Sequence, residues 1–160
     1  MKKKLSFLFL FFISVVLFQS CDKNRVFEKN VTVEKSIWNS TDKMNFEVDV
    51  LDTAATYNVY INVRHASIYP YSNLWLMVTT TSPDGNSQKQ RVEVSLADEE
   101  GAWHGEGMGD IWDLKYLAQQ NARFDKKGKY SFQFEQIMRQ DPLPGIMAMG
   151  LRVEQTTPVN

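Results

Sequence analysis

Four segments of the chain alternate apolar and polar residues with a period of two. Residues 44–50 read MNFEVDV, with an apolar side chain at every second position. The other three segments are residues 57–64, 92–96 and 130–135. Because successive side chains of an extended strand point to opposite faces, this alternation predicts β-strands with one face buried.

Residues 73–81 differ from these segments, because five successive residues within them (LWLMV) are apolar. Such a run is typical of a strand that is covered on both faces. It ends at the turn sequence SPDGN in residues 82–86, which predicts a hairpin with a longer loop to the strand at 92–96. A last strand is expected at residues 147–154, and the tail from residue 155 onward is expected to fray.

One segment carries a hint of helix. Asp110 could cap a helical turn that contains Ile111, Leu114 and Ala118. The alternative for this segment is an irregular crossing loop, and the sequence does not decide between the two.

About seven to nine short strands with almost no helix describe an all-β fold, an antiparallel β-sandwich of the jelly-roll or immunoglobulin-like kind. A chain of this length buries about two thirds of its unfolded surface, which suits one domain with one core. We therefore expect a single sandwich domain over residues 26–155 and a frayed tail at 156–160.

The N-terminus reads as a secretory signal. Three lysines follow Met1, and residues 5–18 are apolar except for two serines. As a helix, this apolar stretch rises about 21 Å, which is short of the ~30 Å that a spanning helix must cross. A cleaved signal over residues 1–20 is therefore favoured over a transmembrane anchor.

The only cysteine, Cys21, follows Ser20 directly after this signal. The pair resembles the lipobox of bacterial lipoproteins, in which the cysteine thiol receives a diacylglycerol and the new N-terminus is usually acylated, for instance with palmitate. The resemblance implies that Cys21 is a lipidated membrane anchor and that residues 21–25 form a short tether. The alternative is a secreted protein with one free thiol, and under either reading no internal disulfide can form.

The charge balance limits the partners. The chain has 18 Lys and Arg and 19 Asp and Glu, and removal of the signal takes three lysines, which leaves a net charge of about −4. This sign argues against nucleic acid and against electrostatic docking to anionic lipid headgroups. With no cysteine pair and two isolated histidines, neither a metal site nor a cofactor is predicted.

The sequence carries no motif of a known catalytic site, such as Gly-x-Ser-x-Gly or His-Glu-x-x-His, and we expect no enzymatic activity. His65 and His104 lie far apart in the sequence. Each is expected to be a surface histidine or a hydrogen-bonded structural one.

Two surfaces are candidates for binding. Tyr69 and Tyr71 flank Pro70 between two predicted strands and, if exposed, would form a rigid aromatic patch of the kind enriched in interfaces, with Trp75 and Tyr60 as neighbours. If buried, the same tyrosines would plug one end of the sandwich.

The second candidate combines Trp103 and Trp112 with Asp110 and Asp113. Carboxylates beside exposed tryptophans are typical of glycan binding and, at a suitable spacing, of glycoside hydrolysis. The simpler alternative is that Trp103 packs into the sandwich while the acidic residues face water.

Two long runs, residues 57–85 and 128–154, resemble a family of gliding-motility lipoproteins of Bacteroidota, designated H. The first run carries NVR at residues 62–64 and YPYSNL at 69–74. The second run carries the matching residues Gly128, Tyr130, Phe132, Met138, Arg139, Leu143, Gly145, Ile146, Gly150 and Arg152.

The resemblance implies a lipid-anchored protein of the cell envelope that serves gliding, with machinery tied to the type IX secretion system. It implies no enzymatic activity and no functional residue beyond the lipidated Cys21. We expect an assembly or stabilising component whose partners are other envelope lipoproteins or secretion and motility components. The alternative function is a lipid-anchored glycan-binding module.

Two short features bear on location. Asp52, Thr53 and Ala54 resemble the O-glycosylation sequence of exported Bacteroidota proteins, which makes Thr53 a possible glycosylation site. The residues after Cys21 lack the acidic cluster that resembles a surface-export signal in this phylum. We therefore expect an outer-membrane anchor with the domain facing the periplasm.

Overall fold

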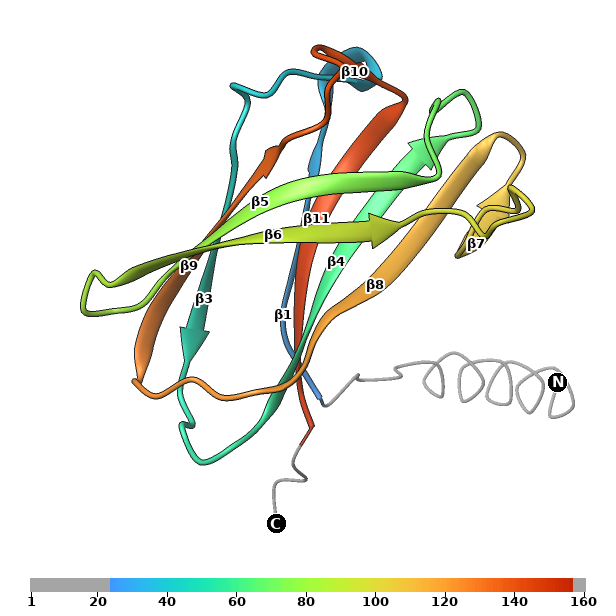
Figure 1. Ribbon diagram of the computed structural model, residues 1–160. Coiled ribbons are helices and arrows are strands. Elements are labelled where there is room, and N and C mark those ends of the chain that lie inside the picture. Colours follow the sequence, from blue (N-terminus) through green and yellow to red (C-terminus); the bar gives the residue numbers. More distant parts are fainter. Residues whose placement is uncertain (1–23, 157–160) are drawn as a thin grey trace, which may run out of the picture.

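A computed structural model describes residues 24–156, which form a sandwich of two antiparallel sheets (Figure 1). Besides one 3-10 turn (Glu34–Ser36), all its regular elements are strands. These strands are β1 (Arg25–Thr32), β2 (Ile37–Trp38), β3 (Met44–Val50), β4 (Tyr57–Ala66), β5 (Asn73–Thr81), β6 (Ser87–Ser95), β7 (Glu106–Met108), β8 (Ile111–Ala122), β9 (Gly128–Gln136), β10 (Leu143–Pro144) and β11 (Ile146–Gln155).

One sheet has five strands in the order β1-β11-β4-β8-β7, and the other has four in the order β3-β9-β5-β6. The short strands β10 and β2 pair with each other. Every strand pair is antiparallel. The predicted antiparallel β-sandwich is confirmed, and eight strands are seven residues or longer.

The core lies between the two sheets and is built from the predicted alternation. In β3 every second side chain is buried, and Phe46 packs against Phe134 of the neighbouring β9 with ring centroids 5.0 Å apart. Each fully buried side chain of this size contributes about 1.5–3 kcal/mol through removal of apolar surface from water. Trp38 of β2 is 1% exposed, and its indole N–H donates to the carbonyl oxygen of Asp42 at 2.8 Å.

The segment that was expected to be a helical turn or a loop is a strand. β8 is the longest strand, with 12 residues, and it pairs with β4. Its more buried side chains, Trp112, Leu114, Tyr116 and Ala118, alternate with more exposed ones. Because Ile111, Leu114 and Ala118 also fall at helical spacing, the sequence suggested the wrong period.

β5 is covered less than predicted. Leu74 and Leu76 are buried toward the core, but Trp75 and Met77 on the other side are only half-buried. The expectation of a strand covered on both faces is therefore wrong. The predicted hairpin to β6 is confirmed, with Thr81 opposite Ser87.

Both termini of the described chain lie at one end of the sandwich (Figure 1). The N–H of Gln155 donates to the carbonyl oxygen of Asn24 at 2.7 Å, and that of Thr156 donates to Thr56 at 2.8 Å. The loops 51–56 and 123–127 border the same end, since Tyr57 is paired with Ala122. We call this the anchor end, and the opposite end, with loops 67–72 and 96–110, the distal end.

The predicted signal, Cys21 and most of the predicted tail lie outside the described residues. In the part of the chain that is described, no helix is long and apolar enough to cross a membrane. Gln155 ends β11 and is hydrogen-bonded, so the expected fraying does not begin at this residue.

Candidate functional site

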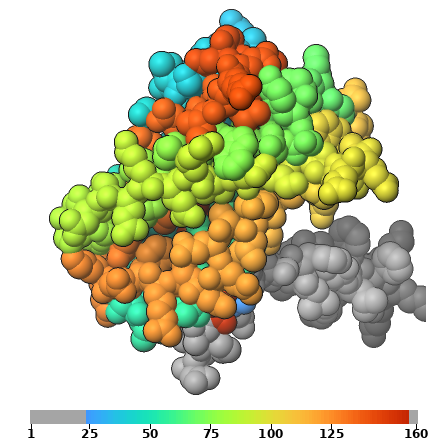
Figure 2. All heavy atoms as spheres, in the orientation of Figure 1, coloured from blue at the N-terminus to red at the C-terminus, as the bar shows by residue number. Residues whose placement is uncertain are grey.

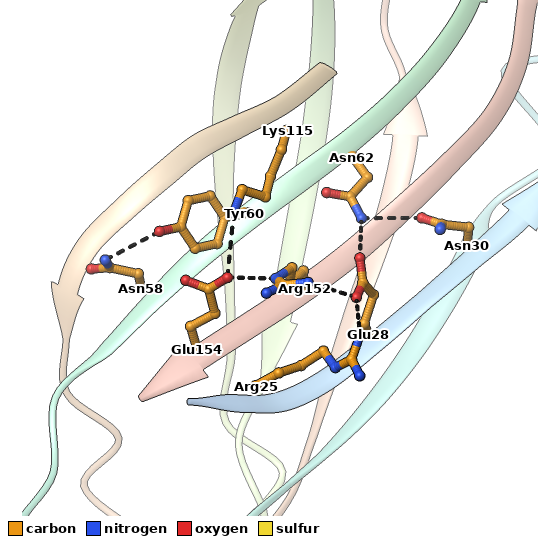
Figure 3. A network of polar contacts seen from close by, with 9 residues as sticks. All are labelled: Arg25, Glu28, Asn30, Asn58, Tyr60, Asn62, Lys115, Arg152 and Glu154. Atoms are coloured by element: carbon orange, nitrogen blue, oxygen red, sulfur yellow. Dashed lines mark hydrogen bonds and ion pairs between the residues drawn. The ribbon is translucent and has the colours of Figure 1, made fainter. Parts of the chain in front are cut away.

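The outer face of the five-stranded sheet carries a dense polar network (Figure 3). Its members come from four neighbouring strands, β1, β11, β4 and β8, at alternate positions except for Arg25, which precedes a register shift in β1. They are Arg25, Glu28, Asn30, Asn58, Tyr60, Asn62, Lys115, Arg152 and Glu154. We call this set the polar face.

Arg152 is at the centre of the polar face. Its Nε donates to Glu154 at 2.5 Å, and its guanidinium also donates to Glu28 at 2.8 Å. Arg25 approaches the same oxygen of Glu28 at 3.0 Å. The Arg152 side chain is only 13% exposed, so its charge is held in place by two carboxylates and is largely shielded from water.

These contacts set the ionisation of the two carboxylates. Burial raises the pKa of Glu28, but the hydrogen bond from Arg25 and the charge of Arg152 outweigh it, so the pKa is lower than usual. Burial also raises the pKa of Glu154. The hydrogen bond and charge of Arg152 and the charge of Lys115 outweigh this effect, so the pKa of Glu154 is lower than usual as well. Both groups therefore remain ionised at neutral pH.

A glycine allows two amides of the polar face to meet. Asn62 donates to Asn30 and to Glu28, each at 3.2 Å, across the position of Gly150 on β11. A Cβ atom at Gly150 would lie 1.8 Å from the Asn30 side-chain oxygen. The Asn62 oxygen is buried and has no hydrogen-bond partner among the described residues.

Tyr60 belongs to the polar face and not to an aromatic patch. The Lys115 ammonium lies 4.6 Å from the centroid of its ring, a cation–π contact, and also approaches Glu154 at 3.4 Å. Tyr60 therefore lies on the outer face of one sheet, whereas Trp75 lies on the outer face of the other.

Tyr69 is buried and does not form part of an exposed patch. It is 2% exposed, and its hydroxyl donates to the carbonyl oxygen of Asn73 at 2.8 Å. Gly145 passes so close that a Cβ there would lie 2.8 Å from the Tyr69 Cα. Burial raises the pKa of the Tyr69 hydroxyl. Tyr69 thus plugs the distal end and cannot itself contact a partner.

Tyr71 and Trp75 are half-buried, and Tyr71 packs against the edge of the core. Tyr71 packs edge-on against Tyr69 with centroids 5.7 Å apart and donates to Gln140 at 2.8 Å. The guanidinium of Arg91 lies 4.9 Å from the centroid of the Trp75 ring. Of the four predicted contact residues, only these two could belong to one partner-binding surface.

The tryptophans of the second candidate surface are engaged in packing. Trp103 stands edge-on to His65 at 4.6 Å between centroids, and Trp112 donates to the Ser67 hydroxyl at 3.2 Å. The Trp112 ring also lies over Gly107, where a Cβ would come within 2.8 Å of it.

The two acidic residues beside them face water. Asp113 is half-exposed and accepts two hydrogen bonds from Arg64, at 2.7 and 2.9 Å. Asp110 is exposed at the turn into β8, where its carbonyl oxygen accepts from Ser67. This arrangement matches the simpler alternative, in which Trp103 packs into the sandwich and the acidic residues face water.

His65 is a structural histidine. It is fully buried, its Nδ1 lies 3.2 Å from the carbonyl oxygen of Ala66, and burial lowers its pKa. His104 is half-buried. Among the described residues there is no group of three side chains that could hold a metal ion.

A groove of about 640 Å³ opens between the edge strand β6 and the part of β8 that lies beyond its pairing with β7 (Figure 2). The ridge formed by the β5–β6 hairpin overhangs it. Its walls carry amide side chains, including Gln88, Gln90 and Gln119, above the largely buried rings of Phe124 and Tyr130. The groove was not predicted, because its two walls lie far apart in the sequence.

The family model for the GldH lipoprotein matches residues 25–153 of this chain. This match begins at the first residue of β1 and ends two residues before the last residue of β11. It therefore covers nearly the whole sandwich.

Two relatives match over nearly their full length. A protein of Christiangramia forsetii named "Gliding motility lipoprotein GldH homolog" is 33% identical over an aligned length of 155 residues, and the match covers 92% of this chain and 94% of the relative. "Gliding motility lipoprotein GldH" of Flavobacterium johnsoniae is 33% identical over 150 residues, with 89% and 92% covered.

Solved structures resemble the chain only loosely. The VP2 subviral particle of infectious bursal disease virus has a TM-score of 0.39 and 14% identity over 84% of this chain and 33% of that one. A family 35 carbohydrate binding module from Clostridium thermocellum has a TM-score of 0.30 and 14% identity over 77% of this chain and 97% of that one. Scores this low do not establish a shared fold.

Proposed function

The chain belongs to the GldH lipoprotein family, and on this premise we propose that it is a non-enzymatic component that assembles or stabilises a gliding-motility complex of the cell envelope. Acyl chains on Cys21 hold it in the outer membrane with the sandwich facing the periplasm. Its partners are other envelope lipoproteins or components of the associated type IX secretion system.

The observation that carries this proposal is the position of Cys21 relative to the family match. The match begins at Arg25, four residues after Cys21, and the first strand begins at the same residue. A lipid on Cys21 would therefore confine the whole sandwich to the membrane surface. Two or more acyl chains make such attachment stable, and confinement raises the effective concentration of the domain near its partners.

The partner contact is assigned to Tyr71 and Trp75. Both are half-buried aromatic residues, and Tyr and Trp are enriched among the residues that contribute most to binding in interfaces. Tyr69 supports Tyr71 from beneath, through the edge-on ring contact. The polar face, in contrast, satisfies its charges internally and is assigned a structural role.

The test is purification of the tagged protein from crosslinked membranes of its own host. Wild-type protein is expected to bring down other envelope lipoproteins or secretion components, and Cys21→Ser is expected to lose them. Tyr71→Ser with Trp75→Ser should reduce recovery at least tenfold, because loss of hot-spot side chains costs about 2 kcal/mol or more.

A matched control is Leu117→Ser, which changes a residue that is 41% exposed on the outer face of the other sheet. It should leave recovery unchanged. Full recovery of partners by the Tyr71 and Trp75 double variant would rule out this contact surface. Recovery of polysaccharide in place of protein would favour the glycan-binding alternative, for which the amide-lined groove offers hydrogen-bonding groups.

A further inference from the structure

We propose that the anchor end of the sandwich rests on an anionic phospholipid surface, with Leu51 in the headgroup region and Arg123 and Lys127 facing lipid phosphates. The inference rests on the proposed lipidation of Cys21. It adds to the lipid anchor a second contact made by the folded domain, and it fixes which end of the sandwich faces away from the membrane.

The stretch of chain between Cys21 and the first strand is short. Three residues separate Cys21 from Arg25, and the four steps between the two residues span at most about 14 Å when fully extended. Arg25 pairs with Glu154 at the anchor end, so this end cannot move far from the lipid. β4, with ten residues, carries the chain about 30 Å to the distal end.

Leu51 is an exposed apolar residue at the anchor end. It is 78% exposed at the start of the β3–β4 connection, so the described residues leave most of its surface uncovered. The loop is held in shape, because the Asp52 side chain accepts from the N–H of Ala54 at 2.9 Å and the Tyr57 hydroxyl donates to the Asp52 carbonyl at 2.6 Å. An ordered loop thus presents an apolar side chain beside the anchor.

Charged side chains are distributed unevenly between the anchor end and the distal end. Loop 123–127 at the anchor end contributes Arg123, Lys126 and Lys127 against Asp125, and loop 51–56 adds one acidic residue, Asp52; Arg123 and Lys127 are exposed. Lys126 is ion-paired with Asp84. Residues 92–114, which reach around the distal end, contain seven acidic residues and no Lys or Arg.

This distribution of charge favours docking of the anchor end to anionic lipid headgroups, which the net charge alone argued against. A net charge of about −4 argues against docking to anionic headgroups only if the charge is spread evenly. Each basic residue close to an anionic surface contributes about 1 kcal/mol. The acidic end, ~30 Å away, lies beyond the ~8–10 Å over which salt allows charges to interact.

The proposed orientation points the distal end toward the periplasm. That end carries Met108, which is 82% exposed, and Ile68, which is 77% exposed. Met108 ends β7 and Ile68 lies in loop 67–72, and the two segments are joined by the hydrogen bond from the Ser67 N–H to the Asp110 carbonyl at 2.8 Å. Partners would therefore meet the distal loops and not the anchor end.

The test uses the mature lipoprotein from its own host, reconstituted in vesicles of phosphatidylethanolamine and phosphatidylglycerol. Because the Cys21 thiol would be consumed by the lipid, Leu51→Cys introduces a single free thiol for a polarity-sensitive fluorophore. We expect a blue-shifted emission that is at least halved by lipids with a spin label at the headgroup. Met108→Cys is the matched control and should show neither effect.

Arg123→Glu combined with Lys127→Glu should restore the aqueous emission at position 51 while the protein still floats with the vesicles. Flotation with an unshifted, unquenched label at position 51 overturns this inference alone. A glycan on Thr53, found by mass in the same sample, would also overturn it, because the sugar would separate the loop from the lipid. If wild-type protein fails to float, the proposed anchor fails and the inference falls with it.

Discussion

Replacement of Trp38 by alanine is expected to lower the free energy of unfolding by about 3–5 kcal/mol. Trp38 is 1% exposed and sits in the short β2–β10 pair, opposite Leu143, which is also fully buried. The change removes the largest buried side chain of this region and leaves the Asp42 carbonyl without its indole donor. Urea unfolding of the mature chain, made soluble by Cys21→Ser, measures the loss.

The neighbouring residue provides the control. Ile37 lies in the same two-residue strand but is 44% exposed, so Ile37→Ala should cost no more than about 1 kcal/mol. Equal losses for the two variants would contradict the assigned packing of Trp38, because the effect would then come from the strand and not from the buried ring.

Replacement of Arg152 by methionine is expected to cost about 1–3 kcal/mol, since it leaves Glu28 and Glu154 without their shared donor in a partly buried site. Both carboxylates lie within 2.8 Å of the Arg152 guanidinium. Arg25→Met is the matched control. Its side chain is 47% exposed, and loss of one surface ion pair costs at most about 1 kcal/mol.

The same variant should change the response to acid. The pKa values of Glu28 and Glu154 are lower in the folded protein than their ordinary value of 4.5. Below that value the unfolded chain binds more protons, so this contribution to stability is complete above about pH 4.5 and declines as the pH falls. Arg152→Met should reduce the slope of stability against pH in this acidic range. An unchanged slope would contradict the role given to Arg152.

Sequence periodicity predicted the strands whose alternation is regular, such as β3 and β9, because one buried face imposes a period of two. It failed for β8, where Leu117 occupies the polar side and weakens the alternation. It also missed β2, β7 and β10, since two or three residues are too few to display a period, and β1, whose apolar residues Val26, Phe27 and Val31 do not alternate regularly.

The polar face was not predicted, because its contacts join residues that are distant in the sequence. Glu28 and Arg152 are 124 positions apart, and only the pairing of β1 with β11 brings them together. A weak signal was present, in that Arg152 and Glu154 occupy alternate positions of a predicted strand. Alternation placed them on one face, but it could not say which residues of the neighbouring strands would face them.

The burial of Tyr69 was equally undecidable from the local sequence. The YPYSN segment contains nothing that distinguishes a surface patch from a plug. Tyr69 is covered by Gly145, which is 76 positions further along the chain and passes directly over the Tyr69 backbone. Gly145 adopts a φ of 88°, which glycine tolerates far better than residues with a side chain.

The lipid at Cys21 underlies both the proposed anchoring and the proposed orientation of the sandwich, and mass spectrometry of the N-terminal peptide of the mature protein from its host tests it. We predict a chain that begins at Cys21 and carries a diacylglycerol on its sulfur, with the protein in the outer-membrane fraction. A mature chain with a free Cys21 thiol in the soluble fraction, or one that still carries residues 1–20, would contradict the account.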